Sequence, residues 1–379
     1  MQDKSPIDTE IATAISAPKM GSKDRKLIAG TVYDIIKNYR FIQYITNKAG
    51  GKHENERHIL ETYCALHAIK YPDDPGNYRP DPDEVHKIQE NPDIPPEVRY
   101  SIPDWLHHHI IKNGSFDWPE VMETLSGIAP LFLRVNTLKC TDDELATHLK
   151  AESIDFDIIS PHCFKLNKHQ NLSRDAFFLK GMFEIQDSGS QLISTFTAPS
   201  PGTMVIDACA GAGGKSLHLA SLMNDKGVIL ALDINPKPLN ALKSRAEKAG
   251  VLIIKSHLYK EIKLADYKGL ADQILCDVPC TATGVLRRQV DQKWRLRPED
   301  LHSLLHTQRE IMNQSWDLLK PGGEMVYSTC SILPDENHLQ VEDFIAHHAD
   351  AHLMASQLLL PQTNGQDGFY MAKIKKRTN

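Results

Sequence analysis

Two cysteines in the sequence lie just after predicted strands, where a side chain is well placed to act as a reactive thiol. Cys280 ends the segment Asp277-Val-Pro-Cys280, and Cys330 lies in Ser328-Thr-Cys330-Ser; an apolar run typical of a buried strand precedes each of them. A single cysteine is most often a small buried hydrophobe, but two at strand ends, one with an acid three residues before it, make that explanation weaker. Because the thiolate is the nucleophilic form of cysteine, the pattern indicates covalent catalysis.

A glycine-rich loop, Asp207-Ala-Cys-Ala-Gly-Ala-Gly-Gly-Lys-Ser216, lies upstream between a strand and a helix. It is not a phosphate-binding P-loop, because position 209 is Cys instead of Gly, and Ser216 breaks the dinucleotide fingerprint. A second acid, Asp233, ends the next strand, where an acid about 20 residues beyond the loop suits a ribose hydroxyl pair. The combination predicts an adenosyl cofactor with a small non-phosphate tail, such as S-adenosylmethionine, with Lys215 facing the cofactor carboxylate or a substrate phosphate. The alternative is a glycine turn that only packs a helix on a sheet.

The elements that must position these residues alternate regularly from Thr203 onward. Strand-like runs (MVID, VILALD, VLIIK, QILCD, EMVYS) are separated by helical segments such as PLNALKSRAEKAG and 298–320. This alternation predicts a doubly wound, mostly parallel sheet, and the carboxyl ends of its strands border one crevice. Every residue singled out above falls at such an end.

The rest of the chain predicts two further regions. Apolar side chains recur at helical spacing in 22–47, so the first 130 residues predict a helical domain. Within it, 71–99 holds seven prolines, eight acids and three bases, and predicts an extended surface loop. Residues 131–200 predict a small α+β subdomain with Thr141 as a helix N-cap.

The charge of the chain and its distribution indicate which kinds of partner the protein can bind. The chain carries 43 Lys+Arg and 49 Asp+Glu, a net charge of −6, of which the 71–99 segment accounts for −5. A basic stretch with one tryptophan, 287–297, suits phosphate contact and base stacking, against the alternative of a solvated loop with Trp294 packed inward. The basic residues expected to contact RNA are Arg287, Arg288, Lys293 and Arg295.

The sequence argues against a disulfide framework, a metal site, secretion and a membrane span. Seven cysteines without a C-x-x-C pair argue against a disulfide framework or a zinc ribbon. Three adjacent imidazoles, His107–His109, cannot all face one ion from a helix, so we read them as surface and expect no metal. The polar N-terminus and the lack of a long apolar stretch predict a cytoplasmic monomer that binds no membrane.

Two thiols, an acid and an adenosyl cofactor suit one reaction in particular. Carbon 5 of cytosine is a poor nucleophile, but a thiolate that adds to carbon 6 makes carbon 5 able to attack a sulfonium methyl group. Asp277 at the N3/N4 edge of the ring would stabilise the developing charge, and a base must then remove the carbon 5 proton.

At these residues the sequence resembles the RsmB/NSUN-type RNA cytosine-5 methyltransferases. The resemblance covers nearly the whole chain in family order, and SKDRKLIAGTVYDIIKNYR (22–40) and IPDWL (102–106) resemble the NusB-like helical domain of the bacterial rRNA members. The shared motifs are LFLRVNTLK (131–139), IQDSGSQL (185–192), DACAGAGGK (207–215), DVPCTATG (277–284), YSTCSILPDEN (327–337) and DGFYMAKIKK (367–376).

The resemblance implies a Rossmann-like class I methyltransferase domain over 201–379, after a NusB-like RNA-binding domain over 1–130 and an α+β subdomain over 131–200. It implies methylation of carbon 5 of a cytosine in ribosomal RNA, with Cys330 as the nucleophile and Cys280 as the thiol that assists product release. The implied S-adenosylmethionine-binding residues are Asp207, Cys209, Ala210, Gly211, Ala212, Gly213, Gly214, Lys215, Asp233 and Asp277.

The sequence also departs from the family pattern. The usual Asp-Pro-Pro-Cys-Ser-Gly is here Asp277-Val-Pro-Cys-Thr-Ala282, and the family's Cys-Ala-Ala-Pro-Gly-Gly-Lys is Cys209-Ala-Gly-Ala-Gly-Gly-Lys215. No acid follows the third strand near the adenine, where 255–260 reads KSHLYK; Ser256 or the backbone is expected to take its place.

Three alternatives remain open. A tRNA could replace ribosomal RNA as the substrate. A DNA cytosine-5 methyltransferase would use the Pro-Cys thiol as nucleophile, but it leaves Cys330 unexplained. A non-catalytic RNA-binding assembly factor would explain the altered loops, but not the retained thiols.

Overall fold

A computed structural model describes residues 7–16, 21–70, 78–114, 116–363 and 365–378. The chain divides into two compact units, which are 1–126 with 286–298, and 127–285 with 299–379. This differs from the predicted boundaries in two ways. The α+β subdomain belongs to the same unit as the methyltransferase-like domain, and the basic 286–298 segment belongs to the helical unit.

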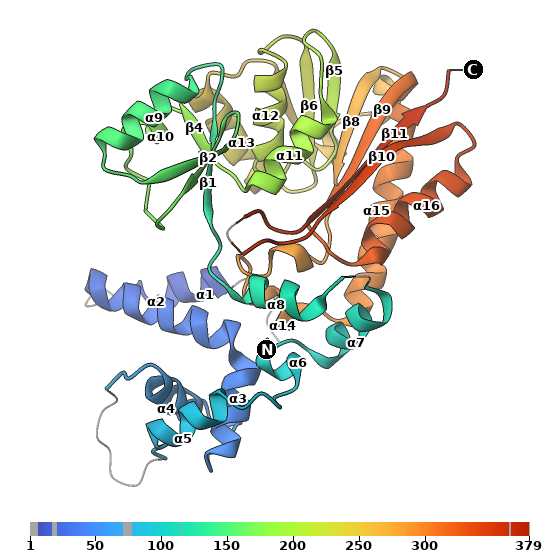
Figure 1. Cartoon of the computed structure of the whole chain (residues 1–379). Coiled ribbons are helices and arrows are strands. Elements are labelled where there is room, and N and C mark those ends of the chain that lie inside the picture. The colour runs from blue at the N-terminus through green and yellow to red at the C-terminus, as the bar shows by residue number, and fades with distance from the viewer. Residues whose placement is uncertain (1–6, 17–20, 71–77, 115, 364, 379) are drawn as a thin grey trace. The chain divides into compact units, whose positions relative to one another are not determined.

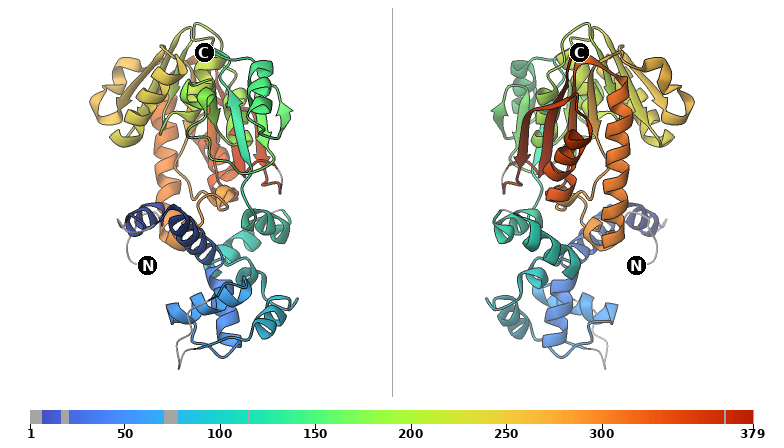
Figure 2. Two further views of the ribbon diagram at one scale, coloured as in Figure 1. Left: turned by 90° about the vertical axis from the view of Figure 1, so that its left-hand side faces the viewer. Right: turned by 90° about the vertical axis from the view of Figure 1, so that its right-hand side faces the viewer.

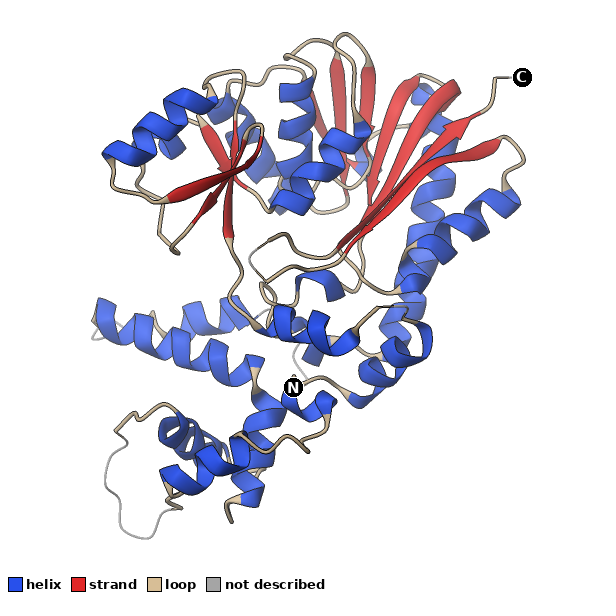
Figure 3. Cartoon of the chain, viewed as in Figure 1, coloured by secondary structure: helices blue, strands red, loops and turns tan. Residues whose placement is uncertain are grey.

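The described residues of the helical unit form helices joined by loops, and no strand lies before Leu131 (Figure 3). The predicted 22–47 helix is divided at Asn38, and the predicted extended loop over 71–99 contains two helices, α5 and α6, beyond Arg79. Its residues 71–77, with Asp73 and Asp74, lie outside the described residues. The helices are α1 (Ile7–Ala14), α2 (Ser22–Lys37), α3 (Tyr39–Lys48), α4 (Glu56–Leu66), α5 (Pro82–Gln89), α6 (Pro96–Arg99), α7 (Asp104–Asn113), α8 (Trp118–Ser126) and α14 (Gln292–Arg295).

The second unit begins with a four-stranded antiparallel sheet in the order β2-β3-β1-β4. Its strands are β1 (Leu131–Val135), β2 (Phe156–Ser160), β3 (Cys163–Leu166) and β4 (Phe183–Ile185). Helices α9 (Asp142–Ala151) and α10 (Ala176–Leu179) accompany it. Thr141 is the N-cap of α9, as predicted, and forms a capping box with Glu144.

A seven-stranded sheet in the order β10-β11-β9-β8-β5-β6-β7 forms the larger part of this unit (Figure 1). The strands are β5 (Met204–Asp207), β6 (Val228–Asp233), β7 (Ile254–Leu258), β8 (Ala271–Asp277), β9 (Leu319–Thr329), β10 (Ala351–Leu359) and β11 (Phe369–Lys376). Strands β5 to β9 pair in parallel, and β10 and β11 run antiparallel at one side. The predicted doubly wound, mostly parallel sheet is therefore confirmed.

Helices cover both faces of this sheet, which explains why its central strands are apolar without alternation. Val205 and Ile229 face one core, and the next residue of each strand, Ile206 and Leu230, faces the other. The helices are α11 (Ser188–Thr197), α12 (Gly214–Leu222), α13 (Pro236–Ala249), α15 (Pro298–Leu318) and α16 (His338–His347). Figure 2 shows the long helix α15, in orange, beside the strands. In the described part of the chain no helix is both long and apolar enough to cross a membrane.

Candidate active site

The two cysteine loops meet at the carboxyl edge of the seven-stranded sheet. Asp277, the last residue of β8, pairs in register with Ser328 near the end of β9, so the segments that follow both strands lie side by side. The Sγ atoms of Cys280 and Cys330 are 3.3 Å apart, and both side chains are partly exposed. The two cysteine loops thus lie together, as the strand ends predicted, and that both thiols border one crevice stays a prediction.

The surroundings of Cys280 favour its protonated form. The hydrogen bond to Cys330 raises the pKa of Cys280 well above its ordinary value, and burial and the charge of an ionised Cys330 raise it further. Cys280 therefore keeps its proton more firmly than an ordinary cysteine does.

A buried hydroxyl network holds the loops in place. Thr281 donates to the Glu336 carboxylate from its backbone N–H at 2.9 Å and from its hydroxyl at 2.5 Å, and Gln308 donates to the same carboxylate at 3.0 Å. Ser331 hydrogen-bonds to Thr281 and Thr283 across the two loops. Because Glu336 is fully buried and accepts three hydrogen bonds, it fixes the backbone beside Cys280.

The departure from the family at position 282 has a local structural consequence. Ala282 adopts a φ of +57°, in the left-handed region that favours glycine, and the family pattern has glycine there. The backbone turn after Cys280 is thus kept although the residue carries a side chain.

An ion pair lies beside the thiols. The Lys215 ammonium donates to Asp277 Oδ2 at 2.6 Å, and the Ser328 hydroxyl donates to Oδ1 at 3.0 Å. Burial by itself would lower the pKa of Lys215, but the charge of Asp277 and the hydrogen bond to it raise the pKa above its ordinary value. Lys215 pairs with Asp277 in this structure, and the expectation that it faces a cofactor carboxylate or a substrate phosphate stays a prediction.

The glycine loop, which ends in Lys215, also contacts the second acid, Asp233. Gly213 has a φ of +80°, and a Cβ atom there would overlap the Leu242 side chain, so only glycine fits. The Gly211 N–H donates to Asp233 Oδ2 at 2.8 Å, and the Asn235 N–H donates to Oδ1 at 2.8 Å. The loop thereby fixes the orientation of the Asp233 carboxylate.

Two arginines that the sequence analysis did not identify hold the carbonyls of the loop. Arg134, fully buried on β1, donates to the Gly214 carbonyl at 2.8 Å, and Arg245 donates to the Ala212 carbonyl at 2.5 Å. Arg245 also pairs with the buried Glu184 carboxylate at 2.7 Å. The sequence carried one signal for this role, because Arg134 interrupts the apolar strand LFLRV.

A cleft of about 500 Å³ opens at the same edge of the sheet. Of the predicted cofactor-binding residues, Cys209, Asp233 and Asp277 line it. Asp207 is buried and accepts a hydrogen bond from Ser216 at 2.6 Å; burial raises its pKa to about 6. The other predicted residues, Ala210, Gly211, Ala212, Gly213 and Gly214, shape the loop but are not among the lining residues of the cleft.

The cleft fits an adenosyl group. The held Asp233 carboxylate offers acceptors for two ribose hydroxyls. The side chain of Ile234, next to it, is 84% exposed and lines the cleft, so it presents an apolar face to a flat ring. After the third strand of this sheet, Tyr259 lines the cleft, and the expected substitute, Ser256, lies within β7 and does not.

The basic segment predicted to contact RNA is largely an internal part of the helical unit. Lys293 is 5% exposed and donates to the Lys37 carbonyl at 2.7 Å, and the Trp294 indole donates to the Ile36 carbonyl at 2.7 Å. Arg287 is also 5% exposed, and Arg295 pairs with Asp291 at 3.0 Å. The prediction is therefore corrected for Arg287 and Lys293, because buried side chains present no surface to a phosphate; Arg288 is exposed.

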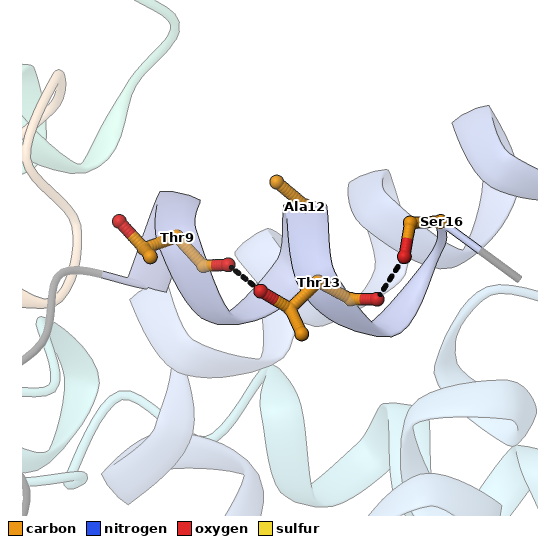
Figure 4. Close-up of a pocket in the computed structure, with 4 residues that line it drawn as sticks. All are labelled: Thr9, Ala12, Thr13 and Ser16. Carbon is orange, nitrogen blue, oxygen red and sulfur yellow. Dashed lines mark hydrogen bonds between the residues drawn. The ribbon is translucent and has the colours of Figure 1, made fainter.

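Other features carry no comparable chemistry. A shallow hollow is lined by Thr9, Ala12, Thr13 and Ser16 of one short helical segment, and Figure 4 shows two of its hydroxyls bonded to the segment's own carbonyls. The expectation of surface imidazoles is wrong for His107, which is buried near Trp118. Among the described residues no three His, Cys, Asp or Glu side chains gather as a metal site would require.

The chain is similar to known proteins over most of its length. Residues 194–375 match the family described as 16S rRNA methyltransferase RsmB/F, and 102–173 match its ferredoxin-like domain. A solved structure of a methyltransferase homolog from Pyrococcus horikoshii is 25% identical, covers 74% of this chain and 97% of its own, and superposes with a TM-score of 0.65. The larger sheet thus has the Rossmann-like fold of S-adenosylmethionine-dependent methyltransferases.

Two curated relatives share the name ribosomal RNA small subunit methyltransferase B. The one from Vibrio cholerae is 34% identical over 294 residues, which are 74% of this chain and 66% of the relative. The one from Shewanella oneidensis is 33% identical over 74% of this chain and 68% of the relative. The chain thus spans about two thirds of the length of these relatives. The family resemblance inferred from the motifs is confirmed, and the chain belongs to the RsmB/F family of 16S rRNA methyltransferases.

Proposed function

We propose that this protein transfers a methyl group from S-adenosylmethionine to carbon 5 of a cytosine in RNA, through a covalent bond between Cys330 and carbon 6. One observation carries the proposal. Two thiols lie 3.3 Å apart beside the Asp277–Lys215 ion pair, at the sheet edge that also bears the adenosyl-sized cleft. Methyl transfer to an ordinary oxygen or nitrogen nucleophile would need no cysteine pair.

The bond-forming step uses the thiolate and the ion pair. Cys330 Sγ forms a bond to carbon 6, and the electron pair of the 5,6 double bond moves to carbon 5 and toward N3. Asp277 accepts a hydrogen bond from the exocyclic amino group, and the Lys215 ammonium stabilises the negative charge on the ring. Bound S-adenosylmethionine supplies the sulfonium methyl group that carbon 5 takes up.

Release requires removal of the carbon 5 proton, and the Cys280 pKa suggests how its role changes. In the free enzyme the hydrogen bond to Cys330 and the Cys330 charge keep Cys280 protonated. Once Cys330 is a thioether, both causes disappear and Cys280 loses its proton more readily. Its thiolate then takes the carbon 5 proton, the 5,6 double bond forms again, and Cys330 leaves as a thiolate.

The substrate class follows from the relatives. Their names specify small-subunit ribosomal RNA, so we propose ribosomal RNA as the substrate and tRNA as the second candidate. The target cytosine must be unpaired or flipped for Cys330 to reach carbon 6. We retain the exposed Arg288 and the partly exposed Arg295 as proposed phosphate contacts.

The test compares four proteins, the wild type, Cys330→Ala, Cys280→Ala and the control Cys64→Ala, which removes a thiol from α4 in the helical unit. Each is incubated with radiolabelled S-adenosylmethionine and with 16S rRNA, tRNA or a matched DNA oligonucleotide. We expect Cys330→Ala to lose methylation, Cys280→Ala to accumulate a denaturant-resistant RNA adduct, and Cys64→Ala to behave as the wild type.

Each alternative has its own outcome. Activity of Cys330→Ala without an adduct in Cys280→Ala would overturn the assigned roles. Methylation of DNA in preference to RNA would favour a DNA methyltransferase. A wild type that binds RNA but no S-adenosylmethionine in calorimetry would favour an assembly factor.

A further inference from the structure

The wall of the cleft beyond Asp233 is built from two elements that the sequence motifs do not include. Tyr259 follows the last residue of β7, and Gln314 lies on α15; both line the cleft. The Tyr259 hydroxyl donates a hydrogen bond to Gln314 Oε1 at 2.5 Å. Apolar side chains, Ile234 and Ile311, line the cleft near this pair.

The pair offers one acceptor and one donor. The Tyr259 oxygen, which donates its proton to Gln314, keeps lone pairs that can accept a hydrogen bond. The Gln314 amide nitrogen has no hydrogen-bond partner among the residues that the structure describes, so its two N–H groups remain available.

Adenine has the complementary pattern on its Watson–Crick edge, where the exocyclic amino group donates and N1 accepts. A carboxylate at this position, as the family usually has, could only accept. We infer that Tyr259 and Gln314 recognise the adenine of the cofactor, Tyr259 accepting from the exocyclic amino group and Gln314 donating to N1.

Geometry supports this assignment independently of any motif. Asp233 ends β6, and Tyr259 follows the neighbouring strand β7, which pairs in register with β6 up to Asp233 and Leu258. Asp233, Ile234 and Tyr259 therefore line one cleft at the same edge of the sheet, so a base attached to a ribose at Asp233 can reach Tyr259 along it. Burial also raises the pKa of Tyr259 to about 12, so the hydroxyl keeps its proton and its bond to Gln314 over the working pH range.

The inference rests on the proposed function, because it assumes an adenosyl cofactor. The probes are S-adenosylhomocysteine and its analogue without the exocyclic amino group, and calorimetry measures the affinity of each. In the wild type, removal of the amino group is expected to weaken binding about fivefold, the usual effect of one hydrogen bond. In Tyr259→Phe, S-adenosylhomocysteine binds about fivefold more weakly, and removal of the amino group has no further effect.

Two matched controls accompany these variants. Tyr267→Phe removes a hydroxyl from a tyrosine that does not line the cleft and should keep the fivefold effect of the amino group. Gln314→Glu replaces the donor that faces N1 by an acceptor and should weaken S-adenosylhomocysteine binding by about tenfold. Asn313→Asp, an exposed neighbour on α15, adds the same charge and should leave the affinity unchanged.

The outcomes separate the inference from the proposed function. If the wild type binds no S-adenosylhomocysteine, the methyltransferase proposal fails. If the wild type binds it but the amino group contributes equally in the wild type and Tyr259→Phe, and Gln314→Glu binds as tightly as Asn313→Asp, the inference is overturned. Gln314 is exposed, so its variant tests the inference even if Tyr259→Phe is unstable.

Discussion

The Lys215 ammonium donates a hydrogen bond to Asp277 Oδ2 at 2.6 Å and so links the glycine loop to the acid that precedes Cys280. Both side chains are mostly buried, with 14% and 26% of their surfaces exposed. We propose that Lys215, although part of the glycine-loop motif, acts on the substrate through Asp277.

Lys215→Met tests this assignment. If the ammonium stabilises charge on the cytosine ring, methyl transfer under saturating cofactor should fall about 100-fold or more, the usual effect of losing such a donor. The affinity for S-adenosylhomocysteine should change less than about threefold, because Lys215 is not among the residues that line the cleft. Single-turnover rates and calorimetry give the two quantities.

The matched control is Lys243→Met, which removes an exposed lysine of α13. It should leave both quantities unchanged. If Lys215→Met loses as much cofactor affinity as methyl-transfer rate, the result would indicate that Lys215 contacts the cofactor carboxylate instead.

Glu336→Gln tests the network behind Cys280. The amide keeps the shape of the carboxyl group but places an N–H group where the carboxylate accepts from Thr281 or Gln308. We expect the free energy of unfolding to fall by about 1–3 kcal/mol, the range for an unsatisfied buried polar group. Urea unfolding measures it, with the exposed Glu342→Gln as the control. Equal stability of the two variants would contradict the proposed role.

The burial of the Lys293 amine should make the stability of the protein depend on pH. Burial, with a smaller effect of Lys37, lowers its pKa to about 7, against about 10.5 in an unfolded chain. Below pH 7 the folded state therefore contains a buried charge, and between pH 7 and 10.5 only the unfolded state holds the extra proton. The free energy of unfolding should rise with pH across this window. Lys293→Met should lack this contribution. The free energy of unfolding of the wild type should therefore increase relative to that of the variant from pH 7 to pH 10.

Tryptophan fluorescence in urea can follow this difference, because Trp105, Trp118 and Trp294 lie in the helical unit. The control is Lys112→Met, an exposed lysine of α7. Lys293→Met should also keep the salt dependence of RNA binding, whereas Arg288→Ala should reduce its slope by about one. A pH-independent difference, or a reduced salt slope in Lys293→Met, would show that Lys293 faces solvent.

Much of this site could be predicted from the sequence because its parts follow strands. Cys280, Cys330, Asp233 and Asp277 each lie at or just after the end of an apolar run, and parallel strands bring such ends to one edge whatever the intervening length. The glycine loop could be predicted because it joins a strand to a helix, but the contact with Leu242 that admits only glycine at position 213 is visible only in the structure.

Contacts between distant side chains could not be predicted, because local patterns do not encode which partner a long side chain finds. Lys293 and Arg287 carry the composition of an RNA-binding loop, but packing against the helical unit buries them. Tyr259 and Gln314 are 55 residues apart in the sequence and meet only because the fold places α15 beside the end of β7. The sequence by itself therefore determined the fold class and the place of the two thiols at strand ends, which follow from hydrophobic periodicity and strand order. Only the tertiary structure decided which charges are buried, what Lys215 pairs with and which side chains line the cleft after the third strand, because burial and pairing depend on the complete packing.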